Sequence, residues 1–452
     1  MKIIIAGDGK VGSTLVSQLT VEGHDITIID NDRSVLDLSL EQYDIMAVEG
    51  NCATMEALKH ADIINADLLI AVTGFDEINL LCCMTAHAMN NNIHTIARIR
   101  NPEYSEQIYA MRDMFALSMV VNPEKMAAVE IGRLLKYPGF LKRDTFSKGR
   151  VEIVELKVEQ GSKLCDVSLS QLGDIVKCKV LVCTVVRNGR AFTPDGSFVL
   201  KSNDRIFVTA PSENLTILLK NLGIIPKKAK TIIIAGGGKI SYYLAQILEK
   251  TSISVTVIEK NRERCQELAA LLPDTDIVFG DVSRQQLLES EGLAECDALV
   301  SLTGLDELNI VTSLFGHSMN VSQLITKLGR IENNGVLDTL PIGSIISPKN
   351  LCCNSIERYV RALQNQTGAA VSVHSIADGN AEAMEFRVDD STKNCGIPLK
   401  KLKLKKGVLL VCISRKGVTE IPSGDSSFIQ GDTVIVVSGS DVIIRNINDI
   451  FM

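Results

Sequence analysis

The chain has 452 residues, of which 46% are hydrophobic and 22% charged, a composition typical of soluble globular proteins with about three domains. Its net charge of −7 disfavours nucleic-acid partners, because the field of the whole molecule repels phosphate backbones. No apolar run approaches the roughly 18 residues that cross a bilayer, and the start of the chain lacks the apolar stretch of a signal peptide. We therefore expect a cytoplasmic protein.

The 12 cysteines are too sparse for a disulfide framework. They include two adjacent pairs, Cys82 with Cys83 and Cys352 with Cys353, and neighbours in sequence rarely bridge. No C-x-x-C pair occurs, so a structural zinc site has no framework. We expect most of these thiols to be small buried side chains in a reducing compartment.

An internal duplication organises the chain. Residues 2–12, KIIIAGDGKVG, match residues 231–241, TIIIAGGGKIS, at an offset of 229. The match continues at an offset of 229 or 230 to the D-E-x-N motifs that begin at Asp76 and Asp306. The sequence is therefore one two-domain unit that occurs twice.

Each half begins with short β-branched runs that alternate with amphipathic helical patterns. The runs of the first half are residues 3–6, 26–29, 45–48 and 68–72. This alternation indicates βαβ units and predicts a parallel sheet with helices on both faces. A proline in a first helical turn then begins a longer helix in each half, at residues 127–135 and 356–363.

Each half ends in a second kind of module, where short strands are separated by Gly-containing turns. This pattern predicts hairpins in a small α+β module. The expected strands are residues 151–158, 179–187, 205–208, 385–388, 408–414 and 433–437. A segment rich in Lys with Gly and Pro, residues 221–230, joins the halves.

We therefore expect an α/β fold with tandem duplicated Rossmann-like parallel-sheet domains, each followed by a small α+β module. The expected boundaries are a first Rossmann-like domain at 1–122, a crossover helix at 123–149, a first module at 150–226, a second Rossmann-like domain at 227–347, a second crossover helix at 348–379 and a second module at 380–452.

The first Gly-rich segment has the context of a dinucleotide site. Gly7, Gly9 and Gly12 follow an expected strand and open an expected helix, as in the G-x-G-x-x-G motif. These glycines permit a tight turn, close approach of a pyrophosphate and close helix packing, and the helix N-terminus offers N–H groups to the anion. Asp30 lies 23 residues after Gly7, where a carboxylate accepts from ribose hydroxyls and favours NAD(H) or an adenine nucleotide over NADP. The alternative is a turn that only connects strand and helix.

The second half repeats this pattern with Gly236, Gly238 and, 23 residues after Gly236, Glu259. Lys10 and Lys239 lie inside the two Gly-rich loops. Each lysine is placed either to reach a phosphate chain or to begin a solvated helix.

No set of catalytic residues accompanies these motifs. Residues 7–14 lack the lysine of a P-loop, which excludes Walker-type hydrolysis. A dehydrogenase needs an acid or base near the nicotinamide, but the six histidines are scattered, and only His87 and His317 correspond across the repeat. We expect a binding protein that is not an enzyme, with a pyridine-nucleotide oxidoreductase as the less favoured alternative.

The combination of these features resembles the TrkA family, the regulatory subunits of bacterial Trk potassium uptake systems, which are built from tandem RCK domains with TrkA-C modules. The resemblance rests on the IIIAGDGKVG opening, Asp30, Gly50-Asn51, Ala71-Val72-Thr73-Gly74 and the D-E-x-N motif, and it covers essentially the whole chain.

This resemblance implies a nucleotide-binding regulatory subunit, cytoplasmic and peripheral on the inner face of the membrane, that couples ATP, ADP or NAD(H) binding to potassium flux. It also implies an integral membrane potassium-transport partner of the TrkH type. Rings of this family commonly hold eight Rossmann domains, so two per chain imply a homotetrameric gating ring. A ligand-binding regulator of another membrane partner remains an alternative.

Carried over by position, the resemblance implies two pockets. The first comprises Gly7, Gly9, Lys10, Val11, Gly12, Asp30, Asn51, Cys52, Thr73, Gly74 and Arg98. The second comprises Gly236, Gly238, Lys239, Ile240, Glu259, Asp281, Thr303 and Lys327. The copies differ where Gly12, Asn51 and Arg98 are replaced by Ser, Asp and Lys, so we do not expect them to bind one ligand equally.

Two further charged features are open to more than one interpretation. Some relatives hold a divalent cation beside a nucleotide phosphate with a carboxylate at the place of Glu124, although its counterpart here is Lys349. Stabilisation of the first helical turn is the alternative role for Glu124. Residues 399–406, LKKLKLKK, carry five lysines that face either an acidic surface or solvent.

Overall fold

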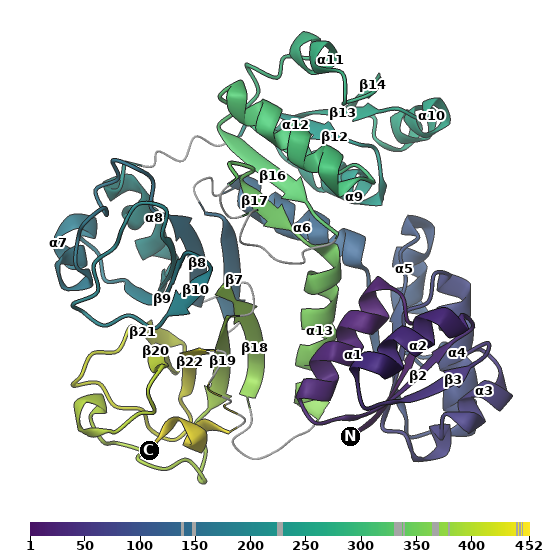
Figure 1. The fold of residues 1–452 in the computed structure, drawn as a ribbon, viewed down its shortest axis with the longest axis horizontal. Coiled ribbons are helices and arrows are strands. Elements are labelled where there is room, and N and C mark those ends of the chain that lie inside the picture. Colours follow the sequence, from purple (N-terminus) through teal and green to yellow (C-terminus); the bar gives the residue numbers. More distant parts are fainter. Residues whose placement is uncertain are drawn as a thin grey trace. The chain divides into compact units, whose positions relative to one another are not determined.

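The chain divides into two compact units, and Figure 1 labels their helices and strands. The computed structural model describes residues 1–136, 140–146, 151–223, 229–329, 337, 340–363, 370–377, 380–439, 442, 444 and 446–452. The first unit comprises Met1–Glu130, Gly238–Ile247 and Ser347–Val360, and the second comprises Ile131–Gly237, Leu248–Ile346 and Arg361–Met452.

The first unit is built on a six-stranded parallel sheet of order β3-β2-β1-β4-β5-β6. Its strands are β1 (Lys2–Ala6), β2 (Asp25–Asp30), β3 (Met46–Glu49), β4 (Leu68–Ala71), β5 (His94–Arg98) and β6 (Met119–Val121). The expected parallel sheet is confirmed. The strand order reverses between β1 and β4, and sheets of this kind bind ligands at the carboxyl ends of the strands at that switch point.

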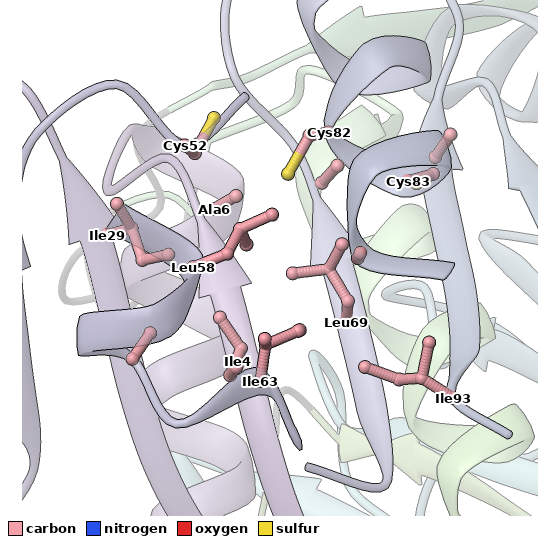
Figure 2. Packing of buried hydrophobic residues seen from close by; sticks show 14 of the residues in the cluster. Ile4, Ala6, Ile29, Cys52, Leu58, Ile63, Leu69, Cys82, Cys83 and Ile93 are labelled. Atoms are coloured by element: carbon pink, nitrogen blue, oxygen red, sulfur yellow. The ribbon is translucent and has the colours of Figure 1, made fainter. Parts of the chain in front are cut away.

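Helices cover both faces of this sheet. They are α1 (Lys10–Val21), α2 (Arg33–Gln42), α3 (Met55–His60), α4 (Asp76–Met89) and α5 (Pro102–Ala110). Side chains of α3 and α4 pack with the sheet in one apolar core, part of which Figure 2 shows. Side chains of α1 and α2 pack in a second core on strands of the same sheet. Burial of both faces explains why the strands are almost continuously apolar.

A helix from the second half of the sequence completes this second core. It is α13 (Pro348–Leu363), whose buried Cys352, Cys353, Ile356 and Val360 join the side chains of α1 and β1. The Cys353 thiol lies 3.7 Å from the carbonyl oxygen of Val11. The amphipathic pattern at residues 356–363 predicted a helix with one apolar face but could not identify its partner.

The second unit repeats the parallel sheet in the order β14-β13-β12-β15-β16-β17. The strands are β12 (Thr231–Ala235), β13 (Ser254–Glu259), β14 (Asp276–Phe279), β15 (Ala298–Ser301), β16 (Gln323–Lys327) and β17 (Ser344–Ile346). The helices α10 (Arg262–Leu271), α11 (Gln285–Ser290) and α12 (Asp306–Ser318) belong to this sheet's part of the chain. The duplication seen in the sequence is therefore a duplication of the fold.

Two five-stranded antiparallel sheets form the modules that end each half. The first has the order β10-β9-β11-β8-β7, with β7 (Lys142–Phe146), β8 (Val151–Lys157), β9 (Leu181–Arg187), β10 (Arg190–Phe192) and β11 (Arg205–Pro211), followed by α8 (Ser212–Asn221). The second has the order β18-β19-β22-β20-β21, with β18 (Ala370–Ile376), β19 (Ala381–Arg387), β20 (Val408–Arg415), β21 (Val418–Glu420) and β22 (Thr433–Gly439).

Two of these strands lie where the sequence predicted crossover helix. In the first half the helix is α6 (Pro123–Lys136), and β7 follows within the segment expected to be helical to residue 149. In the second half β18 begins at Ala370, inside the segment 348–379. The β7 sequence, KRDTF, has four polar residues and no apolar alternation, so it carried no strand signal, and its place at the sheet edge tolerates this. Residues 224–228 of the expected linker lie outside the described residues.

Each module is held by a buried carboxylate. Asp204 is fully buried and accepts from Arg187 through Nε and Nη2, both at 2.7 Å, and from the backbone N–H of Lys201 at 2.7 Å. Asp432 does the same with Arg415, at 2.9 and 2.8 Å. Each carboxylate lies directly before a strand, β11 or β22, and its arginine lies at the end of the neighbouring strand, β9 or β20. The ion pair therefore holds these two strands together in each module.

Candidate functional site

The first Gly-rich loop leaves β1 at the switch point of the first sheet. Gly7 has a φ of +102°, and a Cβ there would come within 2.9 Å of the backbone of Thr73 at the end of β4. A Cβ at Gly12 would lie 1.9 Å from the carbonyl oxygen of Gly7. The loop therefore requires glycine at both places, for backbone conformation at the first and for close packing of the helix at the second.

Helix α1 begins directly after this loop, and its N-terminus has no side-chain cap. Gly9 is the N-cap residue, with an extended φ of −76°, and it has no side chain that could accept from the first N–H groups. Such N–H groups form an anion site when a ligand approaches. Lys10 is exposed at the first helical position, whereas Val11 is 5% exposed and packs in the core. Val11 therefore offers a ligand only its backbone.

Asp30, at the carboxyl end of β2, organises the loop. Its Oδ2 accepts from the backbone N–H of Asp8 at 2.7 Å, and its Oδ1 accepts from the N–H of Asp32 at 3.0 Å. A carboxylate has about four lone-pair sites, so two acceptor positions remain for hydroxyl groups. The carboxylate predicted from the 23-residue spacing thus lies at the Gly-rich loop, where it also has a structural role.

Asp8 is a residue that the sequence analysis did not single out. It is 2% exposed, and its Oδ2 accepts from the Ser39 hydroxyl at 2.6 Å. Its Oδ1 is buried without a hydrogen-bond partner in the described part of the chain. Burial raises the pKa of Asp8, the Ser39 hydrogen bond opposes this, and nearby Asp30 adds to it. The carboxyl group in the middle of the G-x-G motif was the one feature of the sequence that could have indicated a buried acid in this loop.

Asn79, from the D-E-x-N motif, joins the ends of β4 and β5. Its Oδ1 accepts from the N–H and hydroxyl of Thr73 at 2.8 and 2.7 Å, and its Nδ2 donates to the carbonyl of Arg98 at 2.9 Å. Asp76 from the same motif accepts from the N–H groups of Arg100 and Asn101. The motif therefore fixes the backbone around the switch point. Thr73 uses its hydroxyl in this network, and Gly74 is exposed.

Arg98 extends from the end of β5. Its Nη2 donates to the carbonyl of Thr73, whereas its Nε is buried without a hydrogen-bond partner among the described residues. Burial, followed by the charge of Arg100, lowers the pKa of Arg98. A cation with a donor still available is suited to an anionic group.

Asn51 and Cys52 follow β3 at the same edge of the sheet. The side-chain Oδ1 of Asn51 accepts from the N–H of Ala53 at 3.0 Å, which fixes the turn before α3. Asn51 is exposed and Cys52 is 5% exposed. The first half thus brings its predicted site residues to the carboxyl ends of β1 to β5, with Cys52 turned into the core.

Glu124 forms an ion pair with one of its two carboxylate oxygens. Its Oε1 accepts from Arg100 Nε at 2.7 Å, so a guanidinium already neutralises this carboxylate. No group of three metal-ligating side chains occurs within the residues that the structure describes. The ion pair lies at the first turn of α6, and Oε2 of Glu124 is buried without a hydrogen-bond partner among the described residues, so a cation role for Glu124 beside a nucleotide stays a prediction.

The second Gly-rich loop repeats the carboxylate contacts of the first. Gly236 has a φ of +104°, and Glu259 accepts from the N–H groups of Gly237 and Asn261 at 2.6 and 2.8 Å. Gly237 stands in place of Asp8, and Arg264 Nε donates to its carbonyl at 2.8 Å. A Cβ at Gly237 would lie 2.7 Å from Leu268 and 2.9 Å from Glu259, so the second loop has no room for a carboxyl group at this place. The rest of this loop, Gly238, Lys239 and the buried Ile240, belongs to the first unit.

The remaining residues predicted for the second pocket make the same hydrogen bonds as their counterparts in the first half. Asn309 accepts from the N–H and hydroxyl of Thr303 at 2.8 and 2.7 Å and donates to the carbonyl of Lys327 at 3.0 Å. Lys327 Nζ donates to the carbonyl of Thr303 at 2.5 Å. Hydrogen bonds from Ser283 lower the pKa of the exposed Asp281. Asp281 thus fixes its turn as Asn51 does, but without an amide donor.

In the described part of the chain, no helix is both long enough and apolar enough to cross a membrane. The TrkA-N domain family matches residues 3–123 and 232–348, and the TrkA-C domain family matches residues 153–223. The chain is 31% identical to the Trk system potassium uptake protein TrkA homolog of Archaeoglobus fulgidus, over 100% of both chains. It is 32% identical to the Trk system potassium uptake protein TrkA of Vibrio alginolyticus, over 97% of this chain and 95% of that protein.

Solved structures share the fold at lower identity. The crystal structure of the GsuK RCK domain aligns with a TM-score of 0.61 and 18% identity, over 97% of this chain and 92% of that chain. The GsuK channel bound to NAD aligns with a TM-score of 0.59 and 18% identity, over 97% and 77%. GsuK bound to ADP aligns with a TM-score of 0.50 and 15% identity, over 80% and 69%. With both TrkA-N matches and full-length relatives above 30% identity, this chain belongs to the TrkA family.

Proposed function

We propose that this chain is a nucleotide-binding regulatory subunit of a potassium uptake system. Membership of the TrkA family supports this, since the relatives above are named as potassium uptake proteins of the Trk system. The proposal places the chain in the cytoplasm, peripheral on the inner face of the membrane, with an integral potassium-transport subunit of the TrkH type as its partner. It acts by binding, without turnover.

The observation that carries the proposal is the arrangement of Asp30 and the first Gly-rich loop. A carboxylate with two acceptor positions lies beside an uncapped helix N-terminus, the combination that holds ribose and pyrophosphate together in Rossmann domains. We infer an adenine nucleotide, ATP or ADP, or NAD(H) as the ligand. The similar GsuK structures, one bound to NAD and one bound to ADP, agree with this class.

Three donors of the first unit suit the phosphates. The backbone N–H groups at the start of α1 follow the Gly-rich loop directly, and Lys10 is exposed beside them. The Nε of Arg98 makes no hydrogen bond to the described residues. ADP and ATP share adenine and ribose, so Asp30 and Asn51 hold both alike. Any discrimination between them arises at the phosphate end, where Lys10 and Arg98 add charge.

We propose that the first loop is the stronger nucleotide site. The second loop has Ser241 in place of Gly12, and Asp281 offers no amide donor where Asn51 does. Arg264 donates to the carbonyl of Gly237 in the second loop, whereas Lys327 donates to the carbonyl of Thr303 as Arg98 does to that of Thr73. The two halves share a fold but present different groups to a ligand, so unequal affinities follow.

Regulation requires that the nucleotide bind two shapes of the assembly with different affinities, because equal affinity shifts no equilibrium. A coupling of about 1 to 3 kcal/mol, typical of allosteric proteins, changes the populations of the two shapes roughly 5- to 150-fold. This range is sufficient for a nucleotide to regulate the partner's potassium flux.

Replacing Asp30 with Ala tests the nucleotide site. We expect the free energy of ADP binding to weaken by about 1 to 3 kcal/mol, because the ribose hydroxyls lose a charged acceptor and the Gly-rich loop loses its support. Isothermal titration calorimetry measures this change. Asp37→Ala, which removes an exposed carboxylate on α2, is the control that should leave the affinity unchanged. Equal ADP affinity in Asp30→Ala and the wild type would remove Asp30 from the site.

We also propose that four chains close into a ring, each contributing two Rossmann domains to a symmetric assembly. Within each chain we propose boundaries at 122, 226 and 347. The boundaries expected at 149 and 379 are not kept, because β7 and β18 precede them and belong to the sheets of the two modules. Multi-angle light scattering should give four chain masses at micromolar concentration. A single chain mass, unchanged by ADP, would exclude the ring.

A further inference from the structure

A buried pair of polar side chains joins the first Gly-rich loop to α2. Asp8, which lies between Gly7 and Gly9, is 2% exposed, and Ser39 of α2 is 5% exposed. The Ser39 hydroxyl donates to Oδ2 of Asp8 at 2.6 Å. Oδ1 of Asp8 is buried and has no hydrogen-bond partner in the described part of the chain. A carboxyl group that is shielded from water therefore has one donor, among these residues, for its two side-chain oxygens.

The charged groups around Asp8 add negative charge and supply no paired cation. At the end of β2, Asp30 accepts from the backbone N–H of Asp8 at 2.7 Å. On α2, Arg33 is 63% exposed and pairs with Asp37 at 2.8 Å. Lys10, at the start of α1, is exposed. Within the ranges that the structure describes, Asp8 takes part in no ion pair.

These surroundings stabilise the neutral form of the Asp8 carboxyl group. A buried anion needs several donors or a cation, and here a single hydroxyl donates to it. Burial raises the pKa of Asp8, the hydrogen bond from Ser39 opposes this, and nearby Asp30 adds to it. Geometry and pKa agree that loss of the Asp8 proton is unfavourable in the folded protein.

The duplication provides an internal comparison. At the offset of 229, Asp8 corresponds to Gly237 and Ser39 to Leu268. Leu268 is fully buried, and a Cβ at Gly237 would lie 2.7 Å from its Cδ1. The second half thus fills with a leucine side chain the space that the acid and its donor occupy in the first half. The fold does not require an acid at this place, so the pair is a property of the first loop.

Asp8 lies where the charge of a bound phosphate acts on it. The next residue, Gly9, is the N-cap of α1, whose first N–H groups are the anion site of the proposed function. A phosphate there brings negative charge to the loop that already contains Asp8, and a like charge nearby disfavours the ionised form of a carboxyl group. The anion should therefore bind a proton on Asp8 more tightly, and by linkage a proton on Asp8 should tighten the binding of the anion.

We propose that Asp8 is a proton acceptor of the nucleotide site, and that a nucleotide binds the first Gly-rich loop together with a proton on this carboxyl group. The inference rests on the proposed function, since it requires phosphates at this loop. The proton comes from solvent and binds Oδ1, the oxygen without a donor, while Oδ2 keeps its hydrogen bond from Ser39. Bound to the acid, the proton removes one negative charge from the loop.

The sign of the pH dependence follows from this coupling. Where Asp8 is protonated, nucleotide affinity has its full value, and as the pH rises through the pKa of Asp8 the carboxylate repels the phosphates and the affinity falls. A difference of one pKa unit between the free and the bound protein corresponds to an affinity loss of about tenfold. Nucleotide occupancy of the first loop therefore depends on pH through a residue that the second loop lacks.

Calorimetric titration of the full-length protein with ADP tests the coupling, from about pH 5 to about pH 8 and in buffers of different ionisation enthalpy, which together give the protons taken up per ADP. We expect the wild type to take up more protons than Asp8→Asn, and its affinity to fall about tenfold further as the pH rises. Titration of ADP itself contributes equally to both proteins. Asp37→Asn, which changes an exposed carboxylate of α2, is the control that should behave as the wild type.

A second variant and a second measurement guard against misfolding. The double variant Asp8→Gly with Ser39→Leu copies the second half, so it should fold and lose the same proton uptake. Without nucleotide, a raised pKa means that the folded protein binds more protons than the unfolded chain, so Asp8 costs stability as the pH rises. Urea denaturation should therefore find Asp8→Asn more stable than the wild type at about pH 8, with a smaller difference at lower pH.

Equal proton uptake and an equal pH dependence of ADP affinity in the wild type and Asp8→Asn would overturn the inference. ADP binding to neither protein at any pH would overturn the proposed function and the coupling with it. The stability comparison, which uses no nucleotide, would then still show whether the folded protein holds a proton on Asp8.

Discussion

Replacing Gly12 with Ala is expected to abolish nucleotide binding at the first loop and to lower the free energy of unfolding of the first unit by about 3 kcal/mol. A Cβ at this position would lie 1.9 Å from the carbonyl oxygen and 3.0 Å from the carbonyl carbon of Gly7. Both are backbone atoms, so no side-chain rotation relieves the clash. Either α1 must move away from β1 or the Gly-rich loop must open, and both displace the N–H groups that face a phosphate.

Urea denaturation and ADP calorimetry measure the two effects of Gly12→Ala separately. Gly9→Ala is the matched control for stability, since no atom lies within 4 Å of a Cβ at Gly9 and its φ is −76°. We expect this control to stay within about 1 kcal/mol of the wild type, the cost of an N-cap change from Gly to Ala. Wild-type stability and ADP affinity in Gly12→Ala would contradict the geometry of the loop.

The second large effect is expected from Asp204→Ala in the first module. The carboxylate is fully buried and accepts two hydrogen bonds from Arg187 and one from the backbone of Lys201. Its removal leaves the guanidinium without its charged partner, and of its hydrogen bonds to the described residues only that from Nη2 to the Val199 carbonyl remains. Breaking a buried ion pair costs about 3 to 5 kcal/mol, and because the Arg187 side chain is 30% exposed and can regain water, we expect the lower end, about 3 kcal/mol.

Denaturation followed by circular dichroism tests this prediction. Asp432→Ala removes the equivalent carboxylate of the second module, where the Arg415 side chain is 45% exposed, so we expect a smaller loss of stability. Asp195→Ala removes an exposed carboxylate from a turn of the first module and should change the free energy of unfolding by less than about 1 kcal/mol. Equal free energies of unfolding for Asp204→Ala and Asp195→Ala would show that the buried ion pair does not stabilise the module.

The sequence predicted the parallel sheets because their strands are short apolar runs. Such runs are recognised locally, without information on which residues they contact. The strand β7 was missed because KRDTF has the composition of a polar edge. The helix at 356–363 was expected, but its packing on the core of the first unit was not. Apolar surface is non-directional, so an amphipathic pattern identifies a buried face without identifying what covers it.

The same distinction applies to the candidate site. Gly7, Gly12 and Asp30 were identified because backbone geometry and strand order fix their spacing along the chain. The buried carboxyl of Asp8 was not identified, since its partner Ser39 is 31 residues away. Nor was the role of Asn79, which depends on strands that meet only in the folded sheet. Long-range hydrogen bonds of this kind leave no local pattern in a sequence.

The measurement that tests the account most directly is potassium flux into vesicles that contain the membrane partner and this chain, as a function of ADP concentration. The wild type should change the flux with a midpoint near its calorimetric dissociation constant. With Asp30→Ala, the midpoint should move to higher ADP by the same factor as the dissociation constant, roughly 5- to 150-fold for a loss of about 1 to 3 kcal/mol. Flux that does not respond to ADP, or an identical midpoint with both proteins, would contradict regulation through the first Gly-rich loop.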